Sequence, residues 1–276
     1  MCRGSFRSEP RGTMTRPPRI ASLVPSLTEL AVALGLGRQL VARTGFCVHP
    51  AEALRAVPKV GGTKDVNLGK LRRLAPTHVL VNVDENRVGL VDALSAWPAD
   101  ERPEVVVTHP CGPEDVPALI DQLATRFAAV DGVVVRAATL AADLRAELER
   151  TRPPPGPGEA VLYLVWRGPW MTVARDTYIA RLLARVGWST LPAVEGGAHG
   201  AARYPALSGA EPWLAEVRRV LLSSEPYRFD ASHLDAARAL CPNASRVQLV
   251  DGELIGWWGA RTAAGLRYLR ALATAT

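Results

Sequence analysis

Four side chains that bind soft metal ions occur as two closely spaced pairs in the sequence. Cys47 and His49 form a Cys-x-His pair, and His109 and Cys111 form a His-x-Cys pair. Imidazole nitrogens and thiolates are common ligands of zinc and other late transition metals. The spacing matches no zinc signature, and in an extended chain the two members of each pair point to opposite faces. These four residues form a candidate metal site, and the alternative is two polar turns with partly buried thiols.

Signatures of covalent or phosphate chemistry are absent from the sequence. It contains no G-x-S-x-G, no H-E-x-x-H, no P-loop and no G-x-G-x-x-G. The segment Gly61-Gly62-Thr63-Lys64 could hold an anion with its backbone amides, but it lacks the P-loop spacing and is better interpreted as a tight turn. The sequence therefore favours binding over catalysis.

Aromatic residues are concentrated in turns of the second half of the sequence. Trp166 and Trp170 flank a Gly-Pro turn, and Trp257 and Trp258 come shortly before Arg261. Such rings suit a flat organic or macrocyclic ligand, because they lose little conformational entropy on binding. The alternative is ordinary packing of helices onto a sheet. We expect one of the adjacent Trp257 and Trp258 to face the ligand.

The elements that position these residues alternate between strand and helix. Buried-strand patterns alternate with helical ones over residues 19–108, and the alternation restarts near residue 160. This order predicts parallel sheets with helices on their faces. Ligands of such sheets bind beyond the carboxyl ends of the strands, and the unusual residues lie there. HVLVNVDEN (78–86) and RVLLSSEPY (219–227) both end a strand in a polar, acidic turn, so the two halves are expected to be alike.

One long helix is predicted between these halves. An apolar stripe with steps of three and four residues consists of Val133, Ala137, Leu140, Leu144 and Leu148. The segment RPPPGPG then ends the helix. The predicted parts are a disordered N-terminal extension (1–18), an N-terminal α/β lobe (19–131), a bridging helix (132–152) and a C-terminal α/β lobe (153–276).

The composition excludes several classes of protein. Hydrophobic residues make up 48% and charged residues 22%, which excludes disordered, collagen-like and disulfide-scaffold chains. The net charge of +6 is spread along the chain, so no nucleic-acid binding is expected. No apolar run reaches the ~18 residues of a membrane-spanning helix.

The first eighteen residues lack the apolar core of a secretion signal, which predicts a cytoplasmic protein starting at Met1 or Met14. A periplasmic or surface location would require a mis-assigned start.

Six segments resemble, in order, the cobalamin- and siderophore-type substrate-binding proteins of ABC importers. They are RIASLVPSLTELAVALGLG, TGFCVHP, VPKVGGTKDVNLGKLRRLAPTHVLVNVDEN, VWRGPWMTVARDTYI, SSEPYRF and VDGELIGWWGAR. More narrowly, the sequence is similar to the helical-backbone metal receptors of the cobalamin-binding-like group over about residues 19–270. The resemblance implies a TroA-like, class III periplasmic-binding-protein fold. In that fold, two Rossmann-like lobes with parallel sheets are bridged by one long helix.

The resemblance also implies a ligand cleft between the lobes. By position, its lining residues would be Pro25, Ser26, Phe46, Gly62, Thr63 and Asn86 from the first lobe, and Trp166, Trp170, Tyr227, Trp258 and Arg261 from the second. The ligand would be a corrinoid such as cobalamin, a metal chelate or a similar flat molecule, bound without chemistry. An ABC permease would be the protein partner, and we expect a monomer. The alternative is a cytoplasmic enzyme, or a cofactor or metal chaperone, on the same scaffold.

Overall fold

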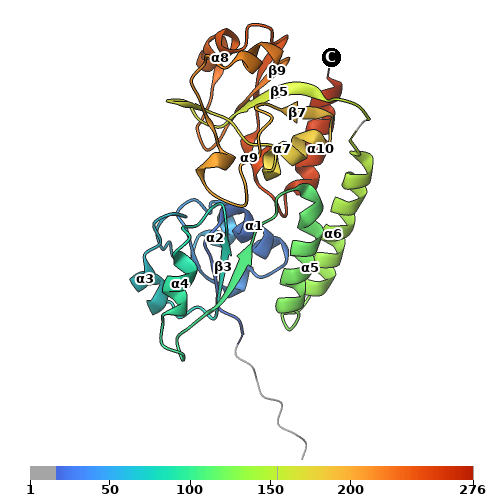
Figure 1. Cartoon of the computed structure of the whole chain (residues 1–276). Helices are drawn as coiled ribbons and strands as arrows, with labels where there is room; N and C mark the ends of the chain where they lie inside the picture. The colour runs from blue at the N-terminus through green and yellow to red at the C-terminus, as the bar shows by residue number, and fades with distance from the viewer. Residues whose placement is uncertain (1–16, 154, 276) are drawn as a thin grey trace, which may run out of the picture.

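The computed structural model describes residues 17–153 and 155–275. Its main strands form two four-stranded sheets, in the orders β2-β1-β3-β4 and β10-β9-β5-β7, and every pairing within them is parallel. Figure 1 shows the sheets in separate lobes, one above the other, with helix α6 (Val133–Arg150) running beside both. The predicted α/β fold with two parallel sheets is confirmed.

The first lobe precedes α6 in the sequence. Its strands are β1 (Ile20–Ser22), β2 (Leu40–Arg43), β3 (His78–Asn82) and β4 (Glu104–Thr108). Its helices are α1 (Pro25–Ala33), η1 (Gly37–Gln39), α2 (Ala51–Leu54), α3 (Leu68–Arg73), α4 (Leu90–Ser95), η2 (Pro113–Asp115) and α5 (Val116–Arg126). Helices cover both faces of this parallel sheet, so its inner strands are continuous apolar runs.

The second lobe follows α6. Its main strands are β5 (Glu159–Leu164), β7 (Trp188–Thr190), β9 (Arg219–Ser223) and β10 (Arg246–Val250), with a short antiparallel pair of β6 (Trp170–Met171) and β8 (Ala206–Leu207). Its helices are α7 (Tyr178–Ala184), η3 (Ala201–Arg203), η4 (Pro212–Glu216), η5 (Ala231–His233), α8 (Leu234–Leu240), α9 (Gly252–Gly256) and α10 (Thr262–Thr274).

The two sheets share one topology. In each, the first strand (β1 or β5) lies between the second (β2 or β7) and the third (β3 or β9), and the fourth forms an edge. Strands β3 and β9 are therefore equivalent. The acidic turns that follow them, with Glu85 in the first lobe and Glu225 in the second, occupy matching places, as the similar sequence patterns predicted.

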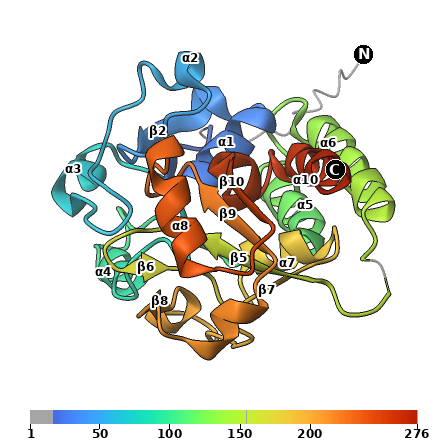
Figure 2. The same cartoon turned by 90° about the horizontal axis from the view of Figure 1, so that it is seen from above.

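Helix α6 joins the lobes through its apolar stripe. Val133, Ala137 and Leu144 are buried in the largest core cluster, while Leu140 and Leu148 pack against it half-buried. The helix packs on α5 from the first lobe and on α10 from the second, and Figure 2 shows the three helices together on one side of the molecule. The exact domain boundaries stay predictions, and residues 1–16 of the expected N-terminal extension lie outside the described residues.

Within the described parts of the chain, no helix is both long enough and apolar enough to cross a membrane.

Candidate functional site

Polar side chains of the two lobes meet where the strands of both sheets end. The contacts join the turn after β3 to the loop before β8, and helix α1 to the segment between α9 and α10. Two arginines of the second lobe form ion pairs with the first lobe.

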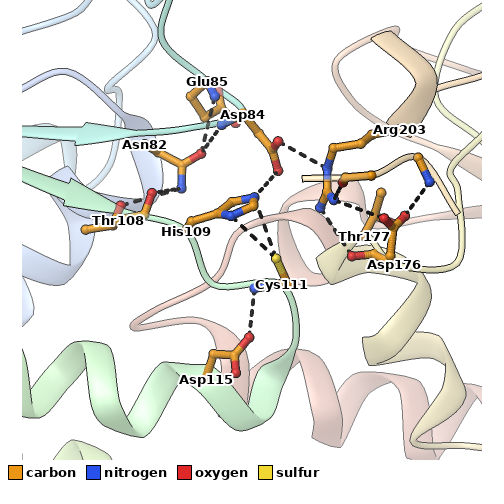
Figure 3. A network of polar contacts seen from close by, with 12 residues as sticks. Asn82, Asp84, Glu85, Thr108, His109, Cys111, Asp115, Asp176, Thr177 and Arg203 are labelled. Atoms are coloured by element: carbon orange, nitrogen blue, oxygen red, sulfur yellow. Dashed lines mark hydrogen bonds and ion pairs between the residues drawn. The ribbon is translucent and has the colours of Figure 1, made fainter. Parts of the chain in front are cut away.

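Arg203 forms the first ionic bridge. Its Nε lies 3.1 Å from Asp84 Oδ1 of the first lobe, and its Nη1 lies 3.4 Å from Asp176 Oδ2 of its own lobe. Figure 3 shows the guanidinium between the two carboxylates. The Arg203 side chain is only 2% exposed. Burial alone would raise the pKa of Asp176, but backbone amides, beginning with Gly196, and the Arg203 charge lower it below its usual value.

Arg261 forms the second ionic bridge in the same manner. Its Nε lies 2.6 Å from Glu29 Oε2 of the first lobe, and its Nη1 lies 2.6 Å from Glu253 Oε2 of the second. The guanidinium also lies over the Trp257 ring, 4.9 Å from its centre. His49 adds a contact between the lobes, with its Nε2 3.2 Å from Glu253 Oε1. Each bridge thus consists of one arginine held between one carboxylate of its own lobe and one of the other.

Two further carboxyl groups lie in the equivalent turns after β3 and β9. Nearby positive charges offset the burial of these groups less than the arginines do in the two bridges. Burial raises the pKa of Glu85 and Asp84 adds to the rise, while Lys64 opposes it. Burial also raises the pKa of Glu225 to about 7, and the charges of Glu253 and Glu85 act in the same direction. Hydrogen bonding by Trp257 and the charge of Arg261 oppose the rise at Glu225. Burial is therefore the first cause of the raised pKa at both carboxyl groups.

The candidate metal ligands do not form one site. Cys47 is buried beside hydroxyl groups, with its Sγ 3.0 Å from Thr28 Oγ1 and 3.1 Å from Thr44 Oγ1, whereas His49 turns to Glu253. Across residues 17–153 and 155–275, no group of three or more His, Cys, Asp or Glu side chains is arranged to hold a metal ion. The turns separate the two pairs, so the quartet expected from the sequence is not assembled.

The second pair of candidate ligands lies beside the Arg203 bridge. His109 Nε2 is 3.4 Å from Asp84 Oδ2, and Cys111 Sγ lies 3.7 Å from Nδ1 and 3.6 Å from Nε2 of His109. Both residues are half-buried, and the Cys111 amide donates to Asp115 Oδ2. Figure 3 shows His109 pointing toward Asp84. The imidazole therefore extends the ionic bridge into the first lobe.

The predicted cleft residues of the first lobe have different surroundings. Ser26 is buried in the first turn of α1, next to half-buried Pro25. Asn86 is buried and donates to the carbonyl oxygens of Leu23 (3.3 Å) and Thr63 (3.0 Å), which holds the loops together.

Phe46 is 63% exposed and lies over Gly62. A Cβ added to Gly62 would lie 3.2 Å from its ring. Phe46 is therefore the side chain of this set that has an open aromatic face.

The predicted aromatic residues of the second lobe also divide into exposed and packed side chains. Trp166 is 40% exposed and meets Tyr227 edge-on, with ring centres 5.5 Å apart. Trp170 stacks on Phe229 at 5.9 Å, and Trp258 is buried in the core. Trp166 is thus the tryptophan of this set most accessible to a ligand.

Arg261, expected to line the cleft, is paired with Glu29 and Glu253. The sequence analysis did not identify Arg203 and Asp176 of the first bridge, or Glu29 and Glu253 of the second. The acidic turn at Asp84 was noticed, but nothing local marked Arg203, which lies at the end of a glycine-rich loop.

A small pocket lies beside β3 and α4 of the first lobe, and a residue of the second lobe forms part of its wall. Its volume is about 170 Å³, and its walls include Val81, Val88, Val107 and His199. Sites for drug-sized molecules are typically about 300–1,000 Å³, so this pocket is too small for a macrocycle.

Comparisons with known proteins give the same fold and a partial sequence match. No family model matches the chain. The chain is 30% identical over 136 residues to the vitamin B12-binding protein of Pectobacterium carotovorum subsp. carotovorum (strain PC1), a match that covers 49% of this chain and 46% of the relative. The chain thus spans less than half the length of the curated relatives that it matches.

Solved structures match almost the whole chain. The periplasmic vitamin B12-binding protein BtuF of Vibrio cholerae superposes with a TM-score of 0.74 at 19% identity, covering 94% of this chain and 99% of that one. A periplasmic heme-binding protein from Pseudomonas aeruginosa superposes with a TM-score of 0.73 at 24% identity, covering 93% and 92%. The resemblance to cobalamin- and siderophore-type substrate-binding proteins is confirmed, and the chain has the fold of this group.

The expected cytoplasmic location is wrong. Solved structures that match over nine-tenths of the chain include several periplasmic binding proteins. The expectation relied on the N-terminal segment, most of which lies outside the described residues.

Proposed function

We propose that this protein binds a flat metal-containing macrocycle, a corrinoid or a heme-like chelate, between its two lobes and performs no reaction on it. Proteins similar in sequence are named vitamin B12-binding proteins, and structural neighbours include B12- and heme-binding proteins. We further propose that it works outside the cytoplasmic membrane, as the binding component of an ABC importer.

The observation that carries this proposal is the exposure of two aromatic side chains in segments that follow strand ends, one in each lobe. Phe46 and Trp166 come from opposite lobes and stay 63% and 40% exposed. Large aromatic surfaces left in water near a cleft are typical of ligand-binding sites, because stacking on a flat ligand buries them. The predicted cleft residues that pack inside the lobes, such as Ser26, Asn86 and Trp258, then support the binding surface from below.

Equilibrium titration tests the proposal directly. Purified protein is titrated with cyanocobalamin and with hemin, and binding is followed by calorimetry and by quenching of tryptophan fluorescence. We expect one of the two to bind with a stoichiometry of one and to quench Trp166. Failure of both macrocycles to bind at micromolar concentrations would overturn the proposal.

A further inference from the structure

Trp166 is the most exposed member of a cluster of five rings in the second lobe. Tyr227 contacts three of the other four rings: Trp166 (5.5 Å between ring centres), Phe229 (4.7 Å) and His233 (5.5 Å). Phe229 also meets His233 edge-on, and Trp170 completes the cluster by stacking on Phe229. Tyr227 is therefore the ring that connects the exposed tryptophan to the packed part of the cluster.

The backbone also ties Tyr227 to Trp166. The Tyr227 amide donates to the carbonyl oxygen of Val165 (3.3 Å), the residue directly before Trp166. Tyr227 follows β9 and Val165 follows β5, and these two strands are neighbours in the sheet. The orientation of the Trp166 ring therefore depends on how the Tyr227 ring is held.

His233 holds the hydroxyl end of Tyr227. Its Nε2 lies 3.1 Å from Tyr227 Oη, and the planes of the two rings are at 89°. The other imidazole nitrogen, Nδ1, lies 2.9 Å from Asp230 Oδ1 and 3.2 Å from Asp230 N. Whichever nitrogen carries the proton, each has a partner, so the imidazole is fixed from both sides.

Asp230 is itself anchored at the start of η5. Its Oδ1 accepts hydrogen bonds from the amide (2.9 Å) and the hydroxyl (2.6 Å) of Ser232. The His233 side chain is only 12% exposed, so its hydrogen bonds are largely shielded from water. A continuous set of contacts thus runs from the backbone at η5 through Asp230, His233 and Tyr227 to the exposed ring of Trp166.

The held orientation of Trp166 has a consequence for binding. A side chain that is fixed before a ligand arrives loses less conformational entropy when the ligand stacks on it. The hydrogen bond between His233 and Tyr227 should therefore increase the affinity for a ligand that stacks on Trp166.

We propose that His233 is a positioning residue of the binding site, which acts through the hydroxyl of Tyr227 to hold Trp166 in the orientation that stacks on the ligand. This inference rests on the proposed binding function and adds a residue outside the lining set expected from the sequence.

A double-mutant cycle tests whether His233 acts through Tyr227. His233→Phe keeps a ring in the cluster but loses both hydrogen bonds, and Tyr227→Phe loses only the hydroxyl. Each change should weaken the binding of cyanocobalamin or hemin, whichever the wild-type protein binds, by about three- to tenfold. The double variant should bind no more weakly than the weaker single variant, because both changes remove the same hydrogen bond.

A second measurement needs no ligand. Time-resolved fluorescence anisotropy reports the local motion of Trp166, whose signal is isolated by subtracting that of the same variant carrying Trp166→Phe. His233→Phe and Tyr227→Phe should both increase this motion. Asp230→Ala, at an exposed position, removes the carboxylate that orients His233. It should act in the same direction, and it provides the test if His233→Phe does not fold.

The matched control is His78→Phe in the first lobe. His78 also meets a ring edge-on, that of Phe127 at 5.0 Å, and its Nε2 lies 3.4 Å from Glu104 Oε2. This variant should keep both the wild-type affinity and the wild-type motion of Trp166.

Two results overturn the inference while the proposed function stands. One is unchanged Trp166 motion and unchanged affinity in His233→Phe, and the other is full additivity of the two single changes in the double variant. If neither macrocycle binds to the wild-type protein, the proposed function is overturned, and the anisotropy decides by itself whether His233 holds Trp166.

Discussion

Arg203 of the second lobe contacts Asp84 of the first at 3.1 Å, with its side chain almost completely withdrawn from water. A buried charge is tolerated only when it is compensated, and Asp176 provides the second partner within the lobe of Arg203. If the lobes separate, Arg203 keeps Asp176 while Asp84 returns to solvent. The bridge can thus open without leaving an isolated guanidinium behind.

Removing the Arg203 charge should destabilise the protein strongly. Arg203→Met keeps most of the side-chain length but leaves Asp84 and Asp176 without their cation, which costs about 3–5 kcal/mol for a buried pair. Denaturant unfolding measures this change. The matched control is Arg145→Met, which breaks an exposed pair with Asp121 and should cost about 0–1 kcal/mol. Equal effects of the two variants would mean that the bridge contributes little.

Helix α6 should lose stability when its buried stripe is truncated. Leu144 is 1% exposed, so Leu144→Ala should cost about 2–5 kcal/mol through lost burial and the remaining cavity. Val135 on the same helix is 70% exposed, and Val135→Ala should cost less than about 0.5 kcal/mol. Equilibrium unfolding of both variants decides the matter. A negligible effect of Leu144→Ala would show that the stripe does not hold the lobes together.

The fold was largely predictable because its signals are local. The alternation of strand and helix patterns expected over residues 19–108 and again from about residue 160 is present in the structure, since short apolar runs must be buried between helices. The steps of three and four from Val133 to Leu148 identified α6, because they place one apolar face along a helix.

The site was less predictable because its contacts join distant parts of the chain. Arg261 pairs with Glu29, 232 residues away, and no local pattern indicates that its guanidinium is already occupied. Arg203 follows a glycine-rich loop without periodicity, so its burial depends on how that loop folds over the first lobe. Trp258 was expected in the cleft but is buried in the core.

The two tryptophans beside the Gly-Pro turn should respond differently to truncation. Trp166 is exposed and contacts Tyr227 edge-on, so Trp166→Ala should leave stability nearly unchanged and weaken macrocycle binding at least about tenfold. Trp170 stacks on Phe229 and is half-buried, so Trp170→Ala should lose about 1–3 kcal/mol of stability. Titration and urea unfolding of both variants measure these effects. Wild-type affinity in Trp166→Ala would remove this ring from the site.

Glu225 should make stability decrease as the pH rises. Its pKa is about 7 in the folded protein, compared with an ordinary value of 4.5. Between these values the folded state binds more protons than the unfolded state, so the free energy of unfolding falls as pH increases through this window. Glu225→Gln carries no such charge. The stability of this variant relative to wild type should rise by about 1–2 kcal/mol from pH 4.5 to pH 8, a value reduced for the partial exposure of the carboxyl.

Urea unfolding at both pH values measures the change, and Glu216→Gln, at an exposed position, should show a constant difference. A constant difference for Glu225→Gln as well would mean that this carboxyl ionises as freely as it does in water.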